Sequence, residues 1–338
     1  MHISDLSESE IVARIQSRLQ PPPDWLLVGI GDDAAVVAPA RGRLEVLTVD
    51  ALVEGIHFDR AVMPPDAIGH RALAVNLSDL AAMGATPRLA LLSLGLPAGL
   101  SCGEFDAIVG GLAALAARHR THVVGGNLTR SPGPLLIDVT VTGTVKHRRV
   151  LTRAGARPGD EVYVTGTLGA AGAGLGMLRE TATAHQPASP ACVQRFCYPE
   201  PRVRVGELLG RNQAATACMD LSDGLADGVH QIARASGVGI EIDADALPIE
   251  SAARTWHAAA GRDPVVASVT AGDDYELVFT CRPKGRGRLR AARLREGPTL
   301  TRIGVCTPGP GVVLRRKAAD GSRAEPMPPG YSHFLVTN

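Results

Sequence analysis

Residues 64–85 read PPDAIGHRALAVNLSDLAAMGA, and this stretch predicts a long helix with one apolar face. Proline is tolerated where a helix begins but not inside one, and Asp66 is a residue type that caps a first turn. Apolar residues follow at helical spacing: Ile68, Leu73, Leu77 and Leu80. The pattern predicts a helix that ends at Met83 and packs against a core.

Two of the polar residues within this predicted helix can act together. Asn76 and Asp79 are three positions apart, so their side chains share a face and can point toward one ligand. A solvated helix edge explains them equally well, and the sequence leaves both interpretations open.

Outward from this helix, strands and helices alternate in both directions. Before it, a strand at 26–30 is followed by two apolar runs around Pro39–Gly42, which predict a hairpin with its second strand at 44–49. After it come strands at 89–96, 122–124 and 135–145, a helix at 105–118, then a strand at 162–165, a Gly/Ala-rich helix at 168–179 and a hairpin turn at Asp320-Gly321. A basic, glycine-containing stretch near residue 148 separates the two series. We therefore expect a mixed α/β (α+β) chain of two domains, residues 1–148 and 149–338.

The composition limits the kinds of partner. Of the 338 residues, 45% are hydrophobic, and 35 Lys and Arg balance 34 Asp and Glu to give a net charge of +1. Such a chain has no bulk field to hold DNA or an acidic membrane surface, so neither nucleic acid nor a membrane is an expected partner. The polar, acidic start is unlike a secretory signal, and the six cysteines include no C-x-x-C pair. We expect a cytoplasmic protein with reduced, buried thiols.

Aspartates gather beside predicted turns and strand ends. Magnesium prefers several oxygen ligands and commonly shares them with substrate phosphates, so this pattern favours a metal–nucleotide site. Each residue alone is also explained as a turn or a helix cap. The aspartates in question are Asp32, Asp33, Asp50, Asp79, Asp220, Asp223, Asp273 and Asp274.

Other nucleotide and calcium motifs explain the sequence less well. Gly29 to Ala34 fits G-x-G-x-x-A, but two carboxylates occupy the place of a pyrophosphate and a β-rich run replaces the required helix. Asp220 to Gly224 lacks the alternating ligands of a calcium loop, and no G-x-x-x-x-G-K-[ST] occurs.

Two glycine-rich or basic segments remain. The glycines at 166–176 are typical either of a phosphate cradle or of a close-packed helix, and the sequence does not choose between them. Seven basic residues within 282–295 alternate with Leu289, Ala292 and Leu294 and include no aromatic residue. We interpret that run as a solvated amphipathic helix.

Eight segments, in order along nearly the whole chain, together resemble the thiamine-monophosphate kinase family. Its superfamily also contains aminoimidazole ribonucleotide synthetase and selenophosphate synthetase. The longest segment, within 72–85, and the closing Gly-Tyr-Ser-His-Phe are the most specific. The segments are 29–34, 53–58, 72–85, 152–156, 164–169, 220–225, 274–277 and 330–334.

The resemblance implies a role for particular residues. Asp33, Thr48, Asp50, Asp79, Asp220 and Asp223 would hold several Mg²⁺ ions, with Asp50 and Asp223 the catalytic carboxylates. A turn at Gly125-Gly126, with Asn127, Arg153 and Ser222, would bind ATP. His57, Asp273 and Tyr331 would contact the acceptor, thiamine monophosphate. A homodimer with an N-terminal sheet that forms a barrel across both copies is also implied, as is a C-terminal α/β domain that completes the ATP and substrate cleft.

The resemblance implies direct transfer of the ATP γ-phosphoryl group to a phosphate oxygen. Because that nucleophile is already an anion, positioning and charge neutralisation suffice. Two alternatives remain: an ATP-dependent synthetase of the same superfamily, and a nucleotide-binding protein without turnover.

The sequence departs from the family pattern beside Asp50. The family has a hydroxyl residue where Val49 stands and an aspartate where Asn127 stands, and both would serve the same ion. We therefore predict that this chain binds fewer Mg²⁺ ions, or binds them less tightly. Asp273 replaces a glutamate, and Pro328-Pro329 replaces a bulky aromatic ahead of Gly330, which leaves the identity of the acceptor less certain.

Overall fold

The computed structural model describes residues 1–180, 189–293, 295–318 and 321–331. Its internal contacts divide the chain into two compact units. The first consists of Met1–Leu80 and Ala85–His147, and the second of Ala81–Gly84 and Arg148–Asn338.

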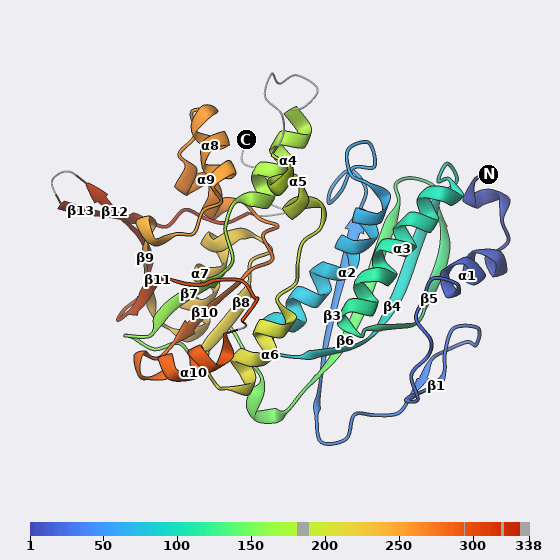
Figure 1. Ribbon diagram of the computed structural model, residues 1–338, viewed down its shortest axis with the longest axis horizontal. Coiled ribbons are helices and arrows are strands. Elements are labelled where there is room, and N and C mark those ends of the chain that lie inside the picture. Colours follow the sequence, from blue (N-terminus) through green and yellow to red (C-terminus); the bar gives the residue numbers. More distant parts are fainter. Residues whose placement is uncertain (181–188, 294, 319–320, 332–338) are drawn as a thin grey trace. The chain divides into compact units, whose positions relative to one another are not determined.

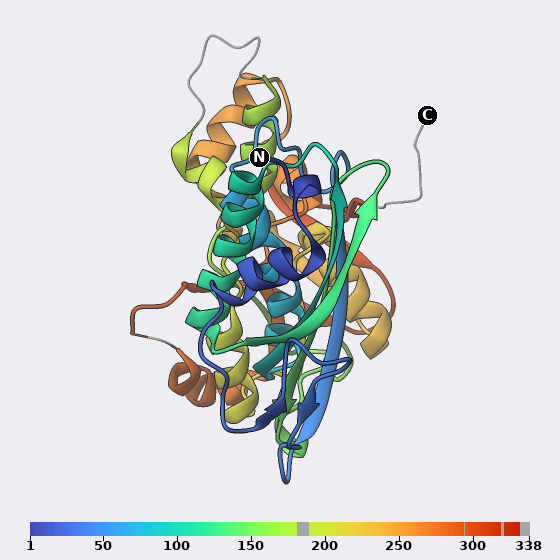
Figure 2. The same ribbon diagram turned by 90° about the vertical axis from the view of Figure 1, so that its right-hand side faces the viewer.

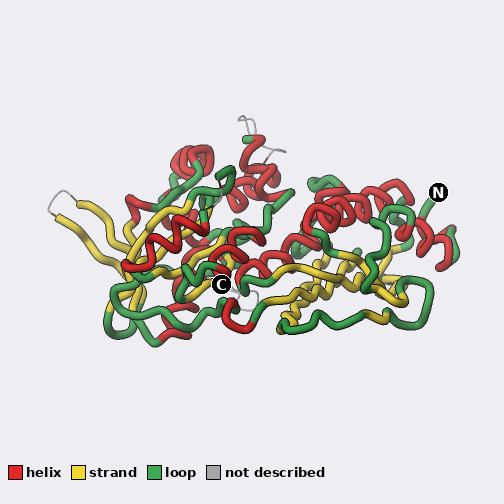
Figure 3. Tube along the Cα trace, turned by 60° about the horizontal axis from the view of Figure 1, so that its bottom comes forward, coloured by secondary structure: helices red, strands yellow, loops and turns green. Residues whose placement is uncertain are grey.

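The first unit is built on a four-stranded sheet whose strands lie in the order β3-β6-β4-β5. Helices α2 and α3 cover one of its faces (Figures 1 and 2), and Figure 3 shows these helices on one side of the strands. A short pair, β1 and β2, precedes the sheet. The bounds are α1 Glu8–Gln16, β1 Leu26–Val28, β2 Val36–Val37, β3 Leu44–Val53, α2 Pro65–Ala82, β4 Thr86–Pro97, α3 Cys102–His119, β5 His122–Ser131 and β6 Leu136–Val145.

Helix α2 confirms the helix predicted from residues 64–85, but it is buried more completely than one apolar face requires. Its four core residues are fully buried, and so is Asn76. A Cβ at Gly69 would lie 1.7 Å from the carbonyl oxygen of Ile108 in α3, so the two helices touch backbone to backbone there. A solvated edge is therefore excluded for Asn76.

The predicted hairpin around Pro39–Gly42 is wrong. Strand β2 pairs with β1, and β3 pairs instead with β6 along the full length of both strands. Even-numbered residues of β3, such as Leu52, face the helices, and the alternating apolar residues of β6 match them. A two-residue strand offers no comparable apolar surface, so the distant partner is preferred.

The second unit contains a seven-stranded sheet in the order β13-β12-β9-β11-β7-β10-β8. All neighbours are antiparallel except β12 and β9, which are parallel. The strands are β7 Glu161–Thr165, β8 Ala217–Asp220, β9 Gly239–Asp243, β10 Leu277–Cys281, β11 Leu300–Thr307, β12 Val312–Ala318 and β13 Gly321–Pro326. The helices are α4 Ala170–Glu180, α5 Pro190–Cys197, α6 Val203–Arg211, α7 Gly224–Ser236, α8 Ser251–Ala259, α9 Pro264–Thr270 and α10 Arg286–Ala292.

Some further predictions concern single features. All six cysteines are free and buried, as predicted. Strands β12 and β13 pair with Ala318 opposite Gly321, but Asp320 of the predicted turn and residues 332–334 of the closing motif lie outside the described residues. In the part of the chain that the structure describes, no helix is long and apolar enough to cross a membrane.

Candidate functional site

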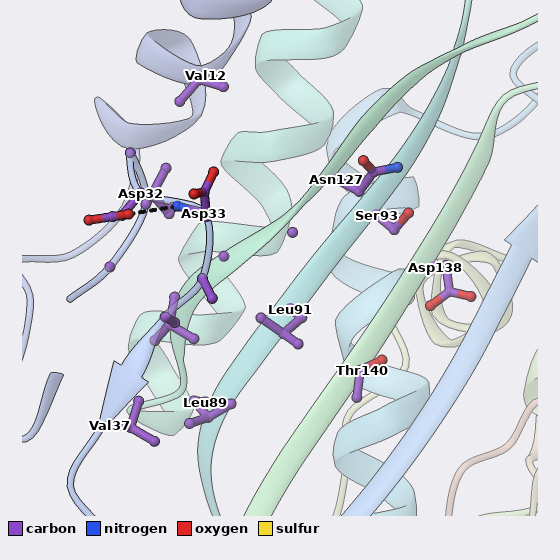
Figure 4. A pocket seen from close by; sticks show the side chains of 18 of the residues that line it. Val12, Asp32, Asp33, Val37, Leu89, Leu91, Ser93, Asn127, Asp138 and Thr140 are labelled. Atoms are coloured by element: carbon purple, nitrogen blue, oxygen red, sulfur yellow. Dashed lines mark hydrogen bonds between the residues drawn. The ribbon is translucent and has the colours of Figure 1, made fainter. Parts of the chain in front are cut away.

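In the first unit, a pocket of about 750 Å³ lies beside the loop that follows β1. Its other side is the face of the sheet that points away from α2. Asp32 and Asp33 stand on the loop side (Figure 4), where the side chain of Asp32 accepts a hydrogen bond from the backbone of Asp33 at 2.9 Å. The segment after this loop is strand β2 and not a helix, which rules out the dinucleotide fingerprint.

Three polar residues form a row on the strands that face this loop. Ser93 of β4 pairs with Asn127 of β5 on one side and with Asp138 of β6 on the other. All three line the pocket (Figure 4). Asp33 and Asn127, which lie on two separate segments, therefore line one pocket.

Gly125 and Gly126 do not form the predicted turn. Both lie within β5, where the register against β4 shifts between Ala90 and Leu91. A Cβ at Gly126 would lie 1.8 Å from the carbonyl oxygen of Leu92. Glycine is required there because two strands approach closely, and the same absence of a side chain leaves backbone open to the pocket.

A second group of carboxylates lies between β3 and α2, on the sheet face that the helices cover. The hydroxyl of Thr48 in β3 donates a hydrogen bond to the Asp79 carboxylate in α2. Burial, together with the charges of Asp79 and Asp138, raises the pKa of Asp50 to about 6. Carboxylates held together in this way favour a cation, so the donor set fits Mg²⁺.

This arrangement is open rather than closed. Within the described ranges, no three His, Cys, Asp or Glu side chains form a group that could hold a metal ion alone. Mg²⁺ commonly keeps waters and takes further ligands from substrate phosphates. The geometry of Thr48, Asp50 and Asp79 therefore fits an ion that arrives with its nucleotide.

His57 lies just after β3. Its Nδ1 atom accepts a hydrogen bond from the backbone of Val53 at 3.1 Å, so the neutral ring carries its proton on Nε2. It is not among the residues that line the pocket described above.

In the second unit, four predicted site residues meet at the start of α7. Asp273 donates its backbone N–H to the Ser222 carbonyl at 2.7 Å, and Tyr331 donates to the Asp223 carbonyl at 3.3 Å. Asp220 ends β8 and is almost fully buried. Asp223 occupies the N-cap position of α7, yet its side chain makes no capping hydrogen bond, so capping does not explain the carboxylate.

Arg153 contacts the side of helix α7. Its guanidinium donates to the side chain of Gln231 at 2.9 Å, and Gln231 in turn donates to Asp227 at 3.1 Å. Gly330, just before Tyr331, packs against Asp227 so closely that a Cβ would lie 2.4 Å from the Asp227 Cβ. The predicted ATP-binding arginine and the C-terminal segment therefore both border α7.

A buried ionic network supports the loop that carries Asp273. Glu276 is fully buried and accepts hydrogen bonds from Arg195 at 2.6 Å, from Thr165 at 2.5 Å and from both sides of the Arg202 guanidinium. Asp273 and Tyr275 have φ of 70° and 48°, a conformation that costs energy unless neighbouring contacts enforce it. The network holds Glu276 in place directly after these two residues.

The neighbouring Asp274 decides between the two interpretations of the 166–176 glycines. Its carboxylate accepts hydrogen bonds from the backbone of Gly169 at 2.7 Å and Ala171 at 3.4 Å, so a protein carboxylate already occupies the start of α4. A Cβ at Gly174 would lie 2.2 Å from the Cys192 carbonyl oxygen. The close-packed helix is confirmed, and a phosphate cradle there is excluded.

Asp138 was not recognised from the sequence. A signal was present, because residues 137–142 alternate between apolar and polar side chains and Asp138 is the one charged residue among the polar ones. The partners of Glu276 gave no such signal, since Arg195 and Arg202 lie 81 and 74 residues away along the chain.

The fold and both sites define the class of protein. Residues 31–145 match the family model for the AIR synthase related protein, N-terminal domain, and residues 157–317 match that for its C-terminal domain.

Three relatives are more specific. The chain is 40% identical to the thiamine-monophosphate kinase of Synechococcus elongatus, over 90% of this chain and 91% of the relative. A crystal structure of thiamine-monophosphate kinase from Stenotrophomonas maltophilia has 37% identity and a TM-score of 0.79, covering 93% and 97% of the two chains. A structure of AaThiL complexed with AMPPCP and TMP has 32% identity and a TM-score of 0.75, covering 99% of each chain. The chain belongs to the thiamine-monophosphate kinase family.

Proposed function

We propose that this chain transfers the γ-phosphoryl group of ATP to the phosphate of thiamine monophosphate, giving thiamine diphosphate and ADP. The observation that carries the proposal is the convergence of Ser222, Asp223, Asp273 and Tyr331, which come from three separate segments, at the start of α7. Relatives over most of the chain's length are thiamine-monophosphate kinases, and one was solved with AMPPCP and TMP.

In the reaction, an oxygen of the acceptor phosphate forms a bond to the γ-phosphorus while the bond to the β,γ-bridging oxygen breaks. The electron pair leaves with ADP. Since the nucleophile is already anionic, no residue has to remove a proton. The work of the protein is to orient two phosphate groups that repel one another and to neutralise their charge.

We assign the residues of each unit separately. In the first unit, Asp33, Thr48, Asp50 and Asp79 hold Mg²⁺ ions, and Gly125, Gly126 and Asn127 contact ATP. When bound, Mg²⁺ neutralises charge on the phosphates. In the second unit, Asp220 and Asp223 also bind Mg²⁺, and Arg153 and Ser222 contact ATP. The family resemblance assigns His57, Asp273 and Tyr331 to the acceptor. The cytoplasmic location stays a prediction.

We further propose a homodimer that forms through the first unit's sheet and closes it into a barrel. The sheet face opposite the helices exposes large apolar side chains, including Leu47 at 71% and Val49 at 58%. Strand β3 is at the edge of the sheet. Exposed apolar surface beside an open edge is typical of an interface.

Phosphorus NMR of the protein with ATP, Mg²⁺ and thiamine monophosphate tests the reaction directly. We expect stoichiometric ADP and thiamine diphosphate. If the reagents remain unchanged, another phosphorylated acceptor must be sought. If ATP binds and is not consumed in the presence of any acceptor, the chain is a nucleotide-binding protein.

A substitution separates catalysis from folding. We expect Asp223→Asn to reduce kcat by about 100-fold or more while thermal unfolding stays close to that of the natural protein, because the side chain caps nothing. Asp245→Asn, at an exposed aspartate of the same unit, is the matched control. An unfolded or fully active Asp223→Asn protein contradicts the assignment.

A further inference from the structure

The second unit contains another pocket, of about 480 Å³, whose lining carries positive charge and no carboxylate. Three basic side chains contribute to it, and two hydrogen-bonding side chains and several small residues form the rest. The lining consists of Gly155, Gln213, Ala214, Ala215, Thr216, Arg282, Lys284, Gly285 and Arg288.

The pocket is formed by fixed backbone. A Cβ at Gly155 would lie 2.4 Å from the Thr216 carbonyl oxygen, so these two segments touch directly. The Thr216 hydroxyl is itself fixed by Asp160 at 2.7 Å and lies 2.7 Å from the Thr280 hydroxyl. Gln213 follows α6 with φ of 50° and donates its backbone N–H to Gly210 at 3.1 Å. One wall is therefore held in place before any ligand arrives.

The charges of the other wall are not neutralised by the protein. Arg286, from the same basic run, pairs with the buried Glu161. Among the described residues, Arg282, Lys284 and Arg288 have no carboxylate partner, although the whole chain is almost neutral. Lys284 and Arg288 are four residues apart on consecutive helical turns, a spacing at which like charges repel. An anion bound between them would remove that repulsion.

The pocket is separate from Asp220, a predicted metal ligand of this unit. Thr216 precedes β8, whereas Asp220 ends it, and a rise of about 3.3 Å per residue puts them roughly 13 Å apart. We propose that Arg282, Lys284 and Arg288 form a second anion site, for a small molecule that carries a phosphate chain. Lysine and arginine are the usual ligands of such groups, and the volume admits a pyrophosphate with further atoms attached.

The test measures binding to the full-length protein by calorimetry, with pyrophosphate, inorganic phosphate and ADP as separate probes. EDTA is present throughout, so that metal-dependent nucleotide binding does not contribute. We expect pyrophosphate to bind more tightly than phosphate. The affinity for pyrophosphate should fall as the salt concentration rises. If ADP and pyrophosphate bind with similar affinity, the site recognises the phosphate chain. If ADP binds at least 10-fold more tightly than pyrophosphate, the natural ligand of the site is a nucleotide.

A matched pair of variants locates the site. One combines Arg282→Ser, Lys284→Ser and Arg288→Ser, and should weaken pyrophosphate binding at least 10-fold. The other combines Arg290→Ser, Arg293→Ser and Arg295→Ser, which removes the same charge from exposed positions of the same run outside the pocket. This variant should change the affinity for pyrophosphate less than twofold. Absence of binding to the natural protein, or equal loss in both variants, overturns the proposal. Kinase activity plays no part in this readout.

Discussion

The carboxyl group of Asp50 lies where burial and two neighbouring carboxylates act against its charge. Its pKa rises from 3.8 to about 6, so the folded protein holds the proton more tightly than the unfolded chain. Ionisation of Asp50 therefore costs stability as pH rises from 3.8 to about 6, and the full cost remains above pH 6. The ionised Asp50 side chain therefore destabilises the metal-free protein at neutral pH, as expected for a residue that serves function rather than folding.

Asp50→Asn should accordingly raise the free energy of unfolding of the metal-free protein at pH 7 by about 1–3 kcal/mol. It should also abolish most of the stabilisation that Mg²⁺ gives to the natural protein. Urea unfolding at pH 5 and pH 7, with and without Mg²⁺, measures both effects. Asp24→Asn, at an exposed aspartate of the same unit, should change neither. A less stable Asp50→Asn protein at pH 7 would refute this account of the pKa.

The position of Asn127 bears on how strongly the chain binds its metal. Its amide lines the same pocket as Asp33 and Asp138, and an amide is a weaker Mg²⁺ ligand than a carboxylate. Asn127→Asp should lower the Mg²⁺ concentration for half-maximal activity several-fold, and should raise the Mg²⁺-dependent shift in the melting temperature. The metal-free variant should be less stable because one more carboxylate is added to the pocket. An unchanged Mg²⁺ requirement in both measurements would reject the prediction.

At the residue scale, the sequence draws attention to polar side chains that interrupt a clear pattern. Asn76 and Asp79 stand out because the helix around them is apolar. Asp138 was missed because a charged residue on the polar side of a strand looks ordinary until its cross-strand neighbours, Ser93 and Asn127, are known. Those pairings depend on the order of strands in the sheet, which local spacing does not contain.

At the scale of the elements, the loop between α9 and β10 is held by Glu276. This buried carboxylate is paired with two arginines of which only 21% and 13% of the side chain is exposed. Glu276→Gln should lower the free energy of unfolding by about 3–5 kcal/mol, because it removes the carboxylate that two largely buried guanidinium groups share. Chemical denaturation measures the loss.

The matched control is Glu241→Gln in β9, which also removes a glutamate from an arginine pair. Its partner Arg315 is 45% exposed, so the cost should stay below about 1 kcal/mol. Similar losses at the two sites would show that burial does not determine how much each ion pair contributes to the free energy of unfolding. If Glu276→Gln folds well enough to assay, a changed KM for the acceptor would further support a role in holding Asp273.

Long elements with strong periodicity were predicted well, and so was the five-residue strand β7, whereas the pairing of strands was not. Helix α2 and strand β6 follow from repeated apolar spacing over many residues. The hairpin around Pro39–Gly42 failed because the pairing of β3 with β6 is set by the match between two ten-residue strands, and a local turn signal cannot outweigh it. Likewise, Gly125-Gly126 looked like a turn, whereas a close approach to β4 requires those glycines inside a strand.

At the scale of the whole molecule, the outer face of the first unit's sheet is the surface on which the proposed dimer depends. A Leu47 side chain that is 71% exposed on an edge strand is unfavourable in a monomer. Leu47→Glu should raise the dissociation constant of the proposed dimer at least 100-fold, since it replaces about 2 kcal/mol of apolar burial with a buried charge. Sedimentation over a range of protein concentrations measures this constant.

Val62→Glu is the matched control, because Val62 is also an exposed apolar residue of the first unit but lies outside the sheet. It should leave the dimer intact. A natural protein that is monomeric at micromolar concentration, or a Leu47→Glu dimer of unchanged affinity, would contradict the proposed barrel. If dissociation also removes activity while each monomer stays folded, the dimer completes the catalytic site. If the monomers remain active, association only covers the apolar face, and every residue that the reaction needs is supplied by one chain.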